Sequence, residues 1–318
     1  MNQTIITAVC LCLASCLYAQ NGKIIDQAPY QHPDTSLDML LKRSADFKEI
    51  QNNTSIKSIT YVSDGLKIKG YLVQPKQSGK YPCVIFCRGG NRDFSFLSSP
   101  QIGLMQTIAN WGYVVIGSQN RGCCGSEGNE EFGGADINDV LNLLQTLEEI
   151  PNADTSRVGI YGISRGGMMA YLALKKSNRF KAAIINSGLS DLFDAISSRP
   201  DGNVMEDSVF AELIPNYKKN KNAALKARSA NFWADSLCKK TPILIMHGSS
   251  DWRVNPDASI ELLRKLYLAN QPVKYIMFPG SAHGLGEYRA EVLYNIKMWL
   301  DDFLKNNKPL PDMKKHGG

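Results

Sequence analysis

The hydrophobic positions of this chain form two patterns that alternate along its length. Continuous apolar runs of five or six residues are typical of parallel strands that are buried on both faces. Such runs occupy residues 82–87, 113–117, 157–161, 182–186, 242–246 and 273–278. Between them, apolar residues recur every three or four positions over 137–147, 257–269 and 292–303, which predicts amphipathic helices.

Two further strands are predicted before this alternation begins. Residues 58–63 and 66–74 are rich in β-branched and aromatic residues, and Asp64-Gly65 between them is a strong hairpin signal. A hairpin followed by repeated strand–helix units predicts an α/β fold with a mostly parallel central sheet of about eight strands, flanked by helices. We expect this unit to span residues 57–306.

Three segments lie outside the regular alternation. Residues 20–56 form a polar N-terminal extension with one helix expected around 37–50. Residues 190–235 are longer and more polar than a single crossover requires, and two interpretations stay open: a cap over the functional site, or a surface excursion of short helices. Residues 307–318 are expected to form a flexible basic tail.

The first residues resemble a targeting signal. Residues 5–19 carry no charge and are mostly apolar, but they are fewer than the roughly 20 residues of a membrane-spanning helix. This pattern predicts a signal peptide over 1–19, cut after Ala19, and therefore an exported protein that is periplasmic or secreted. A second interpretation stays open, because residues 13–16 resemble a lipobox that would leave a lipid anchor on Cys16. No Lys or Arg precedes the apolar run, which is a departure from the usual signal.

The distribution of charge and the spacing of cysteines argue against a nucleic-acid-binding protein and against a zinc-binding protein. The chain has 36 Lys and Arg against 30 Asp and Glu, and the excess is dispersed rather than gathered into a stripe with aromatics, so nucleic acid is not an expected partner. The cysteine spacing does not fit a structural zinc site, and we expect neither metal nor organic cofactor. Cys83 and Cys87 are expected to be core residues. Export would permit a disulfide at Cys123 or Cys124 without fixing its partner.

The candidate nucleophile lies in a Gly-X-Ser-X-Gly pattern at residues 162–166. An apolar strand leads into the pattern and a helix-compatible stretch leads out of it. A sharp strand-to-helix turn exposes the central side chain, and it requires glycines because strand and helix pass too closely for Cβ atoms. We therefore predict Ser164 as the nucleophile, with the backbone N–H of Arg165, at the start of the helix, as an oxyanion donor.

A serine hydroxyl needs a general base, and only four histidines are available. His32 and His316 lie in polar terminal segments, and His247 follows a strand directly, where it is expected to shape the turn. His283 lies on a loop after the last predicted strand, at the sheet edge where sites of α/β folds form. We predict His283 as the base.

The third member of the site is an acid that orients the base. Asp251 lies on the loop after the preceding strand, beside the His283 loop if the two strands are neighbours. Asp257 and Glu287 are nearby, but they lie within or at the start of helices. The order Ser, Asp, His along the chain is that of α/β hydrolases.

Several motifs together resemble one known family. They are residues 88–90, 120–122, 125–128, 134–139, 161–167, 247–254 and 280–284. On these motifs, residues 58–306 resemble the catalytic domain of the prolyl oligopeptidase (S9) family of serine peptidases, within the α/β-hydrolase superfamily. The resemblance implies an α/β-hydrolase fold and an acyl-enzyme formed on Ser164 and released by water.

The sequence departs from the family in two ways. Family peptidases typically carry a β-propeller before this domain, whereas some forty residues precede it here, so the propeller's role in filtering peptides does not carry over. Arg88 stands where family peptidases often have a tyrosine in the oxyanion hole. Arg88 could donate a charged hydrogen bond there, or the loop's backbone N–H groups at Arg88 and Gly89 could serve alone, or Arg88 could form a structural ion pair.

Two other residues have open roles. Arg121 is expected to tie its glycine loop to a carboxylate such as Asp136. Trp252, next to the predicted acid, is a candidate for lining the acyl pocket, with aromatic packing as the equal alternative.

The sequence thus predicts a serine hydrolase of the S9 type that cleaves a small peptide or an acyl ester. A carboxylesterase acting on acylated sugars or plant-derived esters is the main alternative, because both activities use the same machinery. A non-catalytic binding protein on a hydrolase scaffold is a third hypothesis, which the presence of all three triad residue types disfavours.

Overall fold

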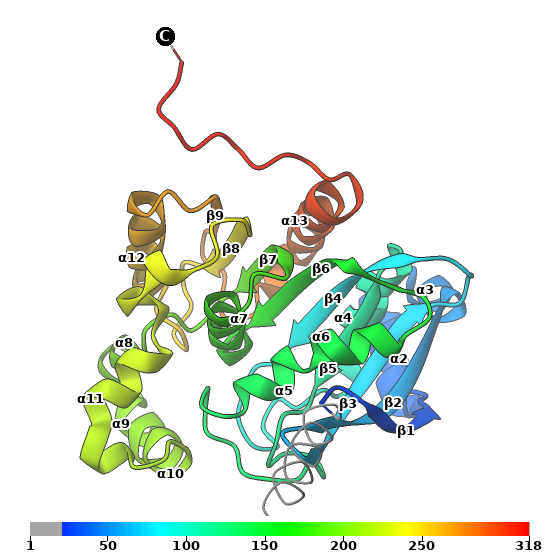
Figure 1. Cartoon of the computed structure of the whole chain (residues 1–318), viewed down its shortest axis with the longest axis horizontal. Helices are drawn as coiled ribbons and strands as arrows, with labels where there is room; N and C mark the ends of the chain where they lie inside the picture. The colour runs from blue at the N-terminus through cyan, green and yellow to red at the C-terminus, as the bar shows by residue number, and fades with distance from the viewer. Residues whose placement is uncertain (1–20, 318) are drawn as a thin grey trace, which may run out of the picture.

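Strands and helices alternate along most of the chain in the computed structural model, which describes residues 21–317. The nine strands of this part of the chain form one sheet (Figure 1). They are β1 Ile24–Pro29, β2 Thr54–Ser63, β3 Leu66–Pro75, β4 Tyr81–Cys87, β5 Val114–Ser118, β6 Ala153–Ile163, β7 Phe180–Asn186, β8 Ile243–Gly248 and β9 Val273–Phe278.

The helices lie on both faces and at one end of this sheet. They are α2 Asp34–Arg43, α3 Phe47–Asn53, α4 Ser99–Asn110, α5 Ile137–Leu141, α6 Leu143–Thr146, α7 Arg165–Lys176, α8 Leu192–Ser197, α9 Gly202–Met205, α10 Ala211–Leu213, α11 Tyr217–Arg228, α12 Pro256–Leu268 and α13 Arg289–Leu300. Short helical turns occur at Leu147–Glu149, Glu206–Phe210, Ala230–Phe232, Ala234–Ser236, Gly286–Tyr288 and Asp301–Lys305.

The strand order is β1-β2-β3-β5-β4-β6-β7-β8-β9. β1, β2 and β3 pair antiparallel, β3 pairs antiparallel with β5, and all pairings from β5 to β9 are parallel. The predicted α/β fold with a mostly parallel sheet is confirmed, and so is the hairpin, because Asp64 and Gly65 both adopt the positive φ that a tight two-residue turn requires.

The central strands, such as β4, β5 and β8, are almost entirely apolar because both faces of the sheet are covered there. Along β4, Val84 and Phe86 belong to the core beneath α4 and α13, whereas Cys83 and Ile85 belong to the core beneath α5, α6, α7 and α12. This alternation gives two hydrophobic layers, one on each side of the sheet. It also places the carboxyl ends of the parallel strands at a single edge, where the loops that carry the candidate residues meet.

The N-terminal extension differs from its prediction. A single helix was expected around residues 37–50, but this stretch forms α2 and α3, and β1 precedes them as a ninth strand. Leu40, Phe47 and Ile50 form a small separate core against α4. β1 carries no strand-like pattern because it is an edge strand whose side chains are mostly exposed, and it ends at Pro29.

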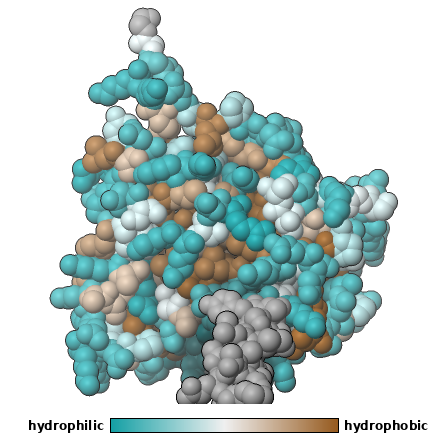
Figure 2. All heavy atoms as spheres, viewed as in Figure 1, coloured by the Kyte–Doolittle hydropathy of each residue, from teal (hydrophilic) through white to brown (hydrophobic). Residues whose placement is uncertain are grey.

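The remaining predicted segments lie at the periphery. The segment 190–235 consists of short helices that project from one end of the sheet (Figure 1). Residues 307–317 form an exposed tail without helix or strand, which extends from the body as a largely hydrophilic projection in Figure 2. The predicted signal peptide at 1–19, with its alternative anchor at Cys16, lies outside the described residues. No helix between residues 21 and 317 is long and apolar enough to span a membrane.

Candidate active site

Ser164 sits on a strained turn between β6 and α7. Its backbone has φ 57° and ψ −125°, a conformation that costs free energy for a non-glycine residue. A Cβ on Gly162 would lie 2.2 Å from the carbonyl oxygen of Gly166, and a Cβ on Gly166 would lie 2.0 Å from that of Cys87. The two glycines are therefore required by the close passage of strand and helix. The turn is held by a hydrogen bond from Ser164 N to the Asn186 carbonyl oxygen at 2.9 Å.

The loop after β4 passes directly beside the serine. A Cβ on Gly89 would lie only 3.2 Å from the Cβ of Ser164, so a side chain there would crowd the serine. On the other side of Ser164, Arg165 begins α7, where the first backbone N–H groups of a helix have no partner within the helix. Gly89 and Arg165 thus both lie next to Ser164, and their role as oxyanion donors stays a prediction.

The side chain of Arg88 has a structural role. Its guanidinium donates to the backbone carbonyl oxygens of Gln119, Gly89, Phe94 and Arg92 at 2.8–3.2 Å, and the residue is 1% exposed. The predicted option of a charged oxyanion bond from Arg88 is therefore wrong, because all three guanidinium nitrogens are engaged in holding the loop.

Arg165 reinforces the same loop from below. Its buried guanidinium pairs with Glu130 at 2.6 Å and with Asp136, and it donates to the Gly90 carbonyl oxygen at 3.0 Å. Glu130 in turn accepts from the backbone N–H of Arg92 at 2.7 Å. This network was not predicted from the sequence.

Arg121 was assigned the wrong acid. It pairs with Asp139 at 2.7 Å and with Asp64 in the β2–β3 turn at 2.8 Å, rather than with Asp136. The predicted role is retained, because these bonds fasten the glycine loop after β5 to the hairpin. The carboxylate of Asp136 is taken by Arg165 instead.

The predicted acid and base are in contact. Nδ1 of His283 lies 2.7 Å from Oδ2 of Asp251, and the acid side chain is fully buried whereas that of His283 is 18% exposed. Oδ1 of Asp251 accepts the backbone N–H groups of Arg253 and Val254 at 2.9 and 3.0 Å. Burial opposes the ionisation of Asp251, but these bonds and the two histidines outweigh it and hold the pKa of the acid below its usual range.

His247 is a second imidazole on the same carboxylate, and this role was missed. Its Nε2 lies 3.2 Å from Oδ2 of Asp251 and 3.0 Å from the Val254 carbonyl oxygen, and its Nδ1 lies 2.8 Å from the Ser259 hydroxyl. Both neighbours of Nε2 are acceptors, so this nitrogen carries a proton and donates it. The only sequence signal was the His four residues before the acid.

A cavity of about 230 Å³ opens beside these groups, and both Ser164 and His283 line it together with Gly89. The three loops after β4, β6 and β9 therefore converge on one space, as expected for the carboxyl edge of a parallel sheet. Trp252 is 51% exposed and is not among the lining residues. Its ring instead packs against the guanidinium groups of Arg253 and Arg199, at 5.2 and 5.7 Å.

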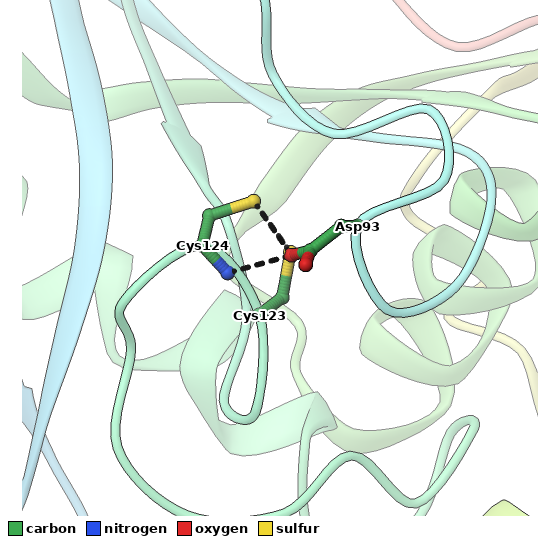
Figure 3. Close-up of side chains that lie close together, drawn as sticks. All are labelled: Asp93, Cys123 and Cys124. Carbon is green, nitrogen blue, oxygen red and sulfur yellow. Dashed lines mark hydrogen bonds between the residues drawn. The ribbon is translucent and has the colours of Figure 1, made fainter.

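Four of the five cysteines in the described part of the chain form two groups, and the fifth, Cys238, is a partly buried free thiol. Cys83 and Cys87 are buried in β4, where burial raises the pKa of both thiols, as expected for core residues. Cys123 and Cys124 are free thiols whose sulfur atoms are 2.8 Å apart, and Asp93 accepts from the backbone N–H of Cys124 at 3.0 Å (Figure 3). Burial also raises the pKa of these two thiols, so the cluster holds protonated sulfur at neutral pH.

The sequence pattern of the prolyl oligopeptidase family matches residues 101–307, well over half of the chain. The chain belongs to this family of serine peptidases. A peptidase of Bacillus subtilis named YtmA is 29% identical over 229 residues, which are 72% of this chain and 86% of the relative. Dipeptidyl-peptidase 5 of Porphyromonas gingivalis is 25% identical over 263 residues, or 76% of this chain.

The chain spans most of the small relative but only 37% of the length of the dipeptidyl-peptidase. Among solved structures, the acylaminoacyl peptidase of Pyrococcus horikoshii matches 85% of this chain with a TM-score of 0.71, and the match covers 45% of that protein. At 24% identity this likeness shows the fold alone. The family match and the mostly parallel sheet together identify the α/β-hydrolase fold. Family membership favours a peptidase over the esterase alternative.

Proposed function

We propose that this protein is a serine peptidase that cleaves small peptides through an acyl-enzyme on Ser164. The observation that carries the proposal is the 2.7 Å contact between Asp251 and His283, at the edge of a cavity that the strained Ser164 also lines. The carboxylate holds the proton of His283 on Nδ1, which leaves Nε2 free to accept the proton of the serine hydroxyl.

The geometry suggests the following sequence of steps. Oγ of Ser164 attacks the carbonyl carbon while Nε2 of His283 takes its proton, and the backbone N–H groups of Arg165 and Gly89 stabilise the oxyanion. His283 then gives the proton to the leaving amine, which leaves the acyl group on Ser164. Water, deprotonated by the same imidazole, releases the acid. Asp251 keeps its charge throughout and stabilises the imidazolium.

The decisive test is labelling with a fluorophosphonate probe followed by peptide mapping. We expect label on Ser164 in the wild type, none in Ser164→Ala, and normal labelling in Ser95→Ala, a variant that removes another hydroxyl from the same cavity. Equal labelling of Ser164→Ala and wild type would exclude this nucleophile. We expect Ser164→Ala and His283→Ala each to lower turnover by about three orders of magnitude or more.

Peptide specificity is tested by parallel assays on N-blocked aminoacyl-anilides and short acyl esters. We expect turnover of both, since an acyl-enzyme forms more easily from an activated ester than from an amide. The names of the relatives favour peptide bonds as the natural substrate. Hydrolysis confined to the esters would remove the peptide assignment and keep the serine chemistry.

We also propose that the chain is exported after cleavage behind Ala19. The uncharged apolar run at residues 5–19 supports this, as does its end at a small residue. Mass spectrometry of the mature protein is expected to find Gln20 as the first residue. A mature chain beginning with lipidated Cys16 would establish the anchored alternative, and retention of Met1 in the cytoplasm would exclude both.

A further inference from the structure

The charged residues that line the cavity are all arginines. Arg43, Arg253 and Arg289 line it, and among its lining residues in the described chain none is Asp or Glu. Ser164 and His283 line the same cavity, so a ligand that fills it beside Ser164 also lies in the field of these arginines. A site of this kind disfavours an ammonium group and favours a carboxylate.

Among these arginines, Arg289 gives the strongest argument for a bound anion. It is half-buried at the first position of α13, where the positive end of the helix dipole makes a cation unfavourable. Burial and the nearby charge of Arg43 lower its pKa, and Tyr161 is the other titratable group that acts on it. Helix stability therefore does not account for this arginine. A bound anion would offset both the burial and the repulsion.

The cavity also has apolar and aromatic lining residues, which include Phe86, Leu104, Tyr161, Val292 and Ile296. The volume of about 230 Å³ is below the roughly 300–1,000 Å³ of sites for drug-sized ligands, so the cavity suits one side chain or acyl group rather than a peptide strand.

We propose that this cavity binds the part of the substrate that consists of an apolar body ending in a carboxylate, with Arg289 and Arg43 as its anion-binding residues. The inference rests on the proposed function, because it assigns a substrate class to the same serine site. A bidentate guanidinium–carboxylate contact gives geometric selectivity as well as charge. The carboxylate belongs either to the acyl group or to a leaving group with a free C-terminus, and both share this chemistry.

Kinetics on matched substrates test the proposal and separate its two forms. The acyl-side pair is p-nitrophenyl butyrate and p-nitrophenyl hemiglutarate, and the leaving-side pair is a blocked dipeptide with a free C-terminal carboxylate and its amide. We expect kcat/KM to be at least tenfold higher for the charged member of one pair. Equal rates within both pairs would overturn the proposal.

Variants then assign the effect to the arginines. Arg289→Met is expected to lower kcat/KM for the charged substrate about 10–100-fold, chiefly through KM, while the neutral member changes less than twofold. Arg43→Met, at the exposed end of α2, is expected to have a smaller effect and preserves the test if Arg289→Met fails to fold. Arg264→Met, an exposed arginine paired with Glu261, is the matched control. Equal losses on both members of a pair would contradict anion binding.

Binding to the Ser164→Ala variant distinguishes this inference from the proposed function. We expect calorimetry to detect 4-phenylbutyrate but not 4-phenylbutylamine, and Arg289→Met in the same background to weaken the carboxylate at least tenfold. If the wild type hydrolyses nothing and the carboxylate still binds, the proposed function fails and the anion site stands. If esters are hydrolysed and neither charged ligand binds, the anion site fails alone.

Discussion

Replacement of Asp251 by Asn tests the central geometry of the site. The two oxygens of the carboxylate have different partners, and these partners decide how an Asn amide must be oriented. Oδ1 accepts two backbone N–H groups at 2.9 and 3.0 Å, so an amide NH₂ at this position would face two donors. The Asn oxygen must therefore stay there. Its NH₂ then takes the place of Oδ2, 2.7 Å from Nδ1 of His283 and 3.2 Å from Nε2 of His247.

The size of the effect follows from this forced orientation. An NH₂ opposite Nδ1 requires that nitrogen to accept, so the proton of His283 moves to Nε2, where it blocks transfer from Ser164. The wrong tautomer costs about 10⁴-fold in kcat in serine proteases with an Asp–His pair. At about 1.36 kcal/mol for each factor of ten, this is roughly 5 kcal/mol of transition-state stabilisation.

The assay is turnover of an acyl ester or anilide at pH 7 by purified Asp251→Asn protein. Asp257→Asn is the matched control, since it removes the same charge from an exposed residue at the start of α12. The control is expected to stay within twofold of the wild type. A folded Asp251→Asn protein, checked by circular dichroism, that retained a tenth or more of the wild-type kcat would refute the argument that this carboxylate fixes the tautomer of His283.

Three further outcomes are expected. His247→Asn removes the second donor to Asp251 and should lower kcat about 10–100-fold with KM within twofold; a change confined to thermal stability would leave His247 purely structural. Gly166→Ala places a Cβ 2.0 Å from the Cys87 carbonyl oxygen and should lower the melting temperature by several degrees or prevent folding, whereas Gly286→Ala, with nothing within 4 Å, should do neither in a thermal melt. The lowered pKa of Asp251 means that its ionised form stabilises the fold above about pH 4 and that this contribution is lost as the pH falls toward the folded-state pKa. In urea unfolding, the stability difference between wild type and Asp251→Asn should therefore be larger at pH 7 than at pH 3, and an unchanged difference would contradict the assignment.

Much of the fold was predictable because the sheet is covered on both faces. Continuous apolar runs such as 82–87 stand out from their surroundings, and β4 covers that run with nearly every residue buried. β1 was missed for the opposite reason, since an exposed edge strand needs no hydrophobic pattern. The helix expected over 137–147 is broken into α5, α6 and a short turn. The spacing of apolar residues indicates which side of a segment is buried, but it does not show whether the helical backbone is continuous.

Only part of the candidate site could be predicted from the sequence. Ser164, Asp251 and His283 could be proposed from the sequence because each follows a recognisable strand and the number of histidines is small. The partners of buried charges could not, because the choice between Asp136 and Asp139 depends on the path of a loop through space. His247 was assigned to a turn for the same reason: its distance to the acid depends on how the chain folds back after β8.

The family match begins at residue 101, but the folded unit does not. β2, β3 and β4 all precede that position, as do Gly89 beside the serine and Arg43 at the cavity. A fragment cut at the limits of the match would lose Arg43 and Gly89 from the lining of the cavity. It would also lack β4, which pairs with both β5 and β6. The shortest fragment to express therefore starts near Asn21. Chimaeras that exchange substrate preference between relatives should exchange residues 21–53 together with the matched region.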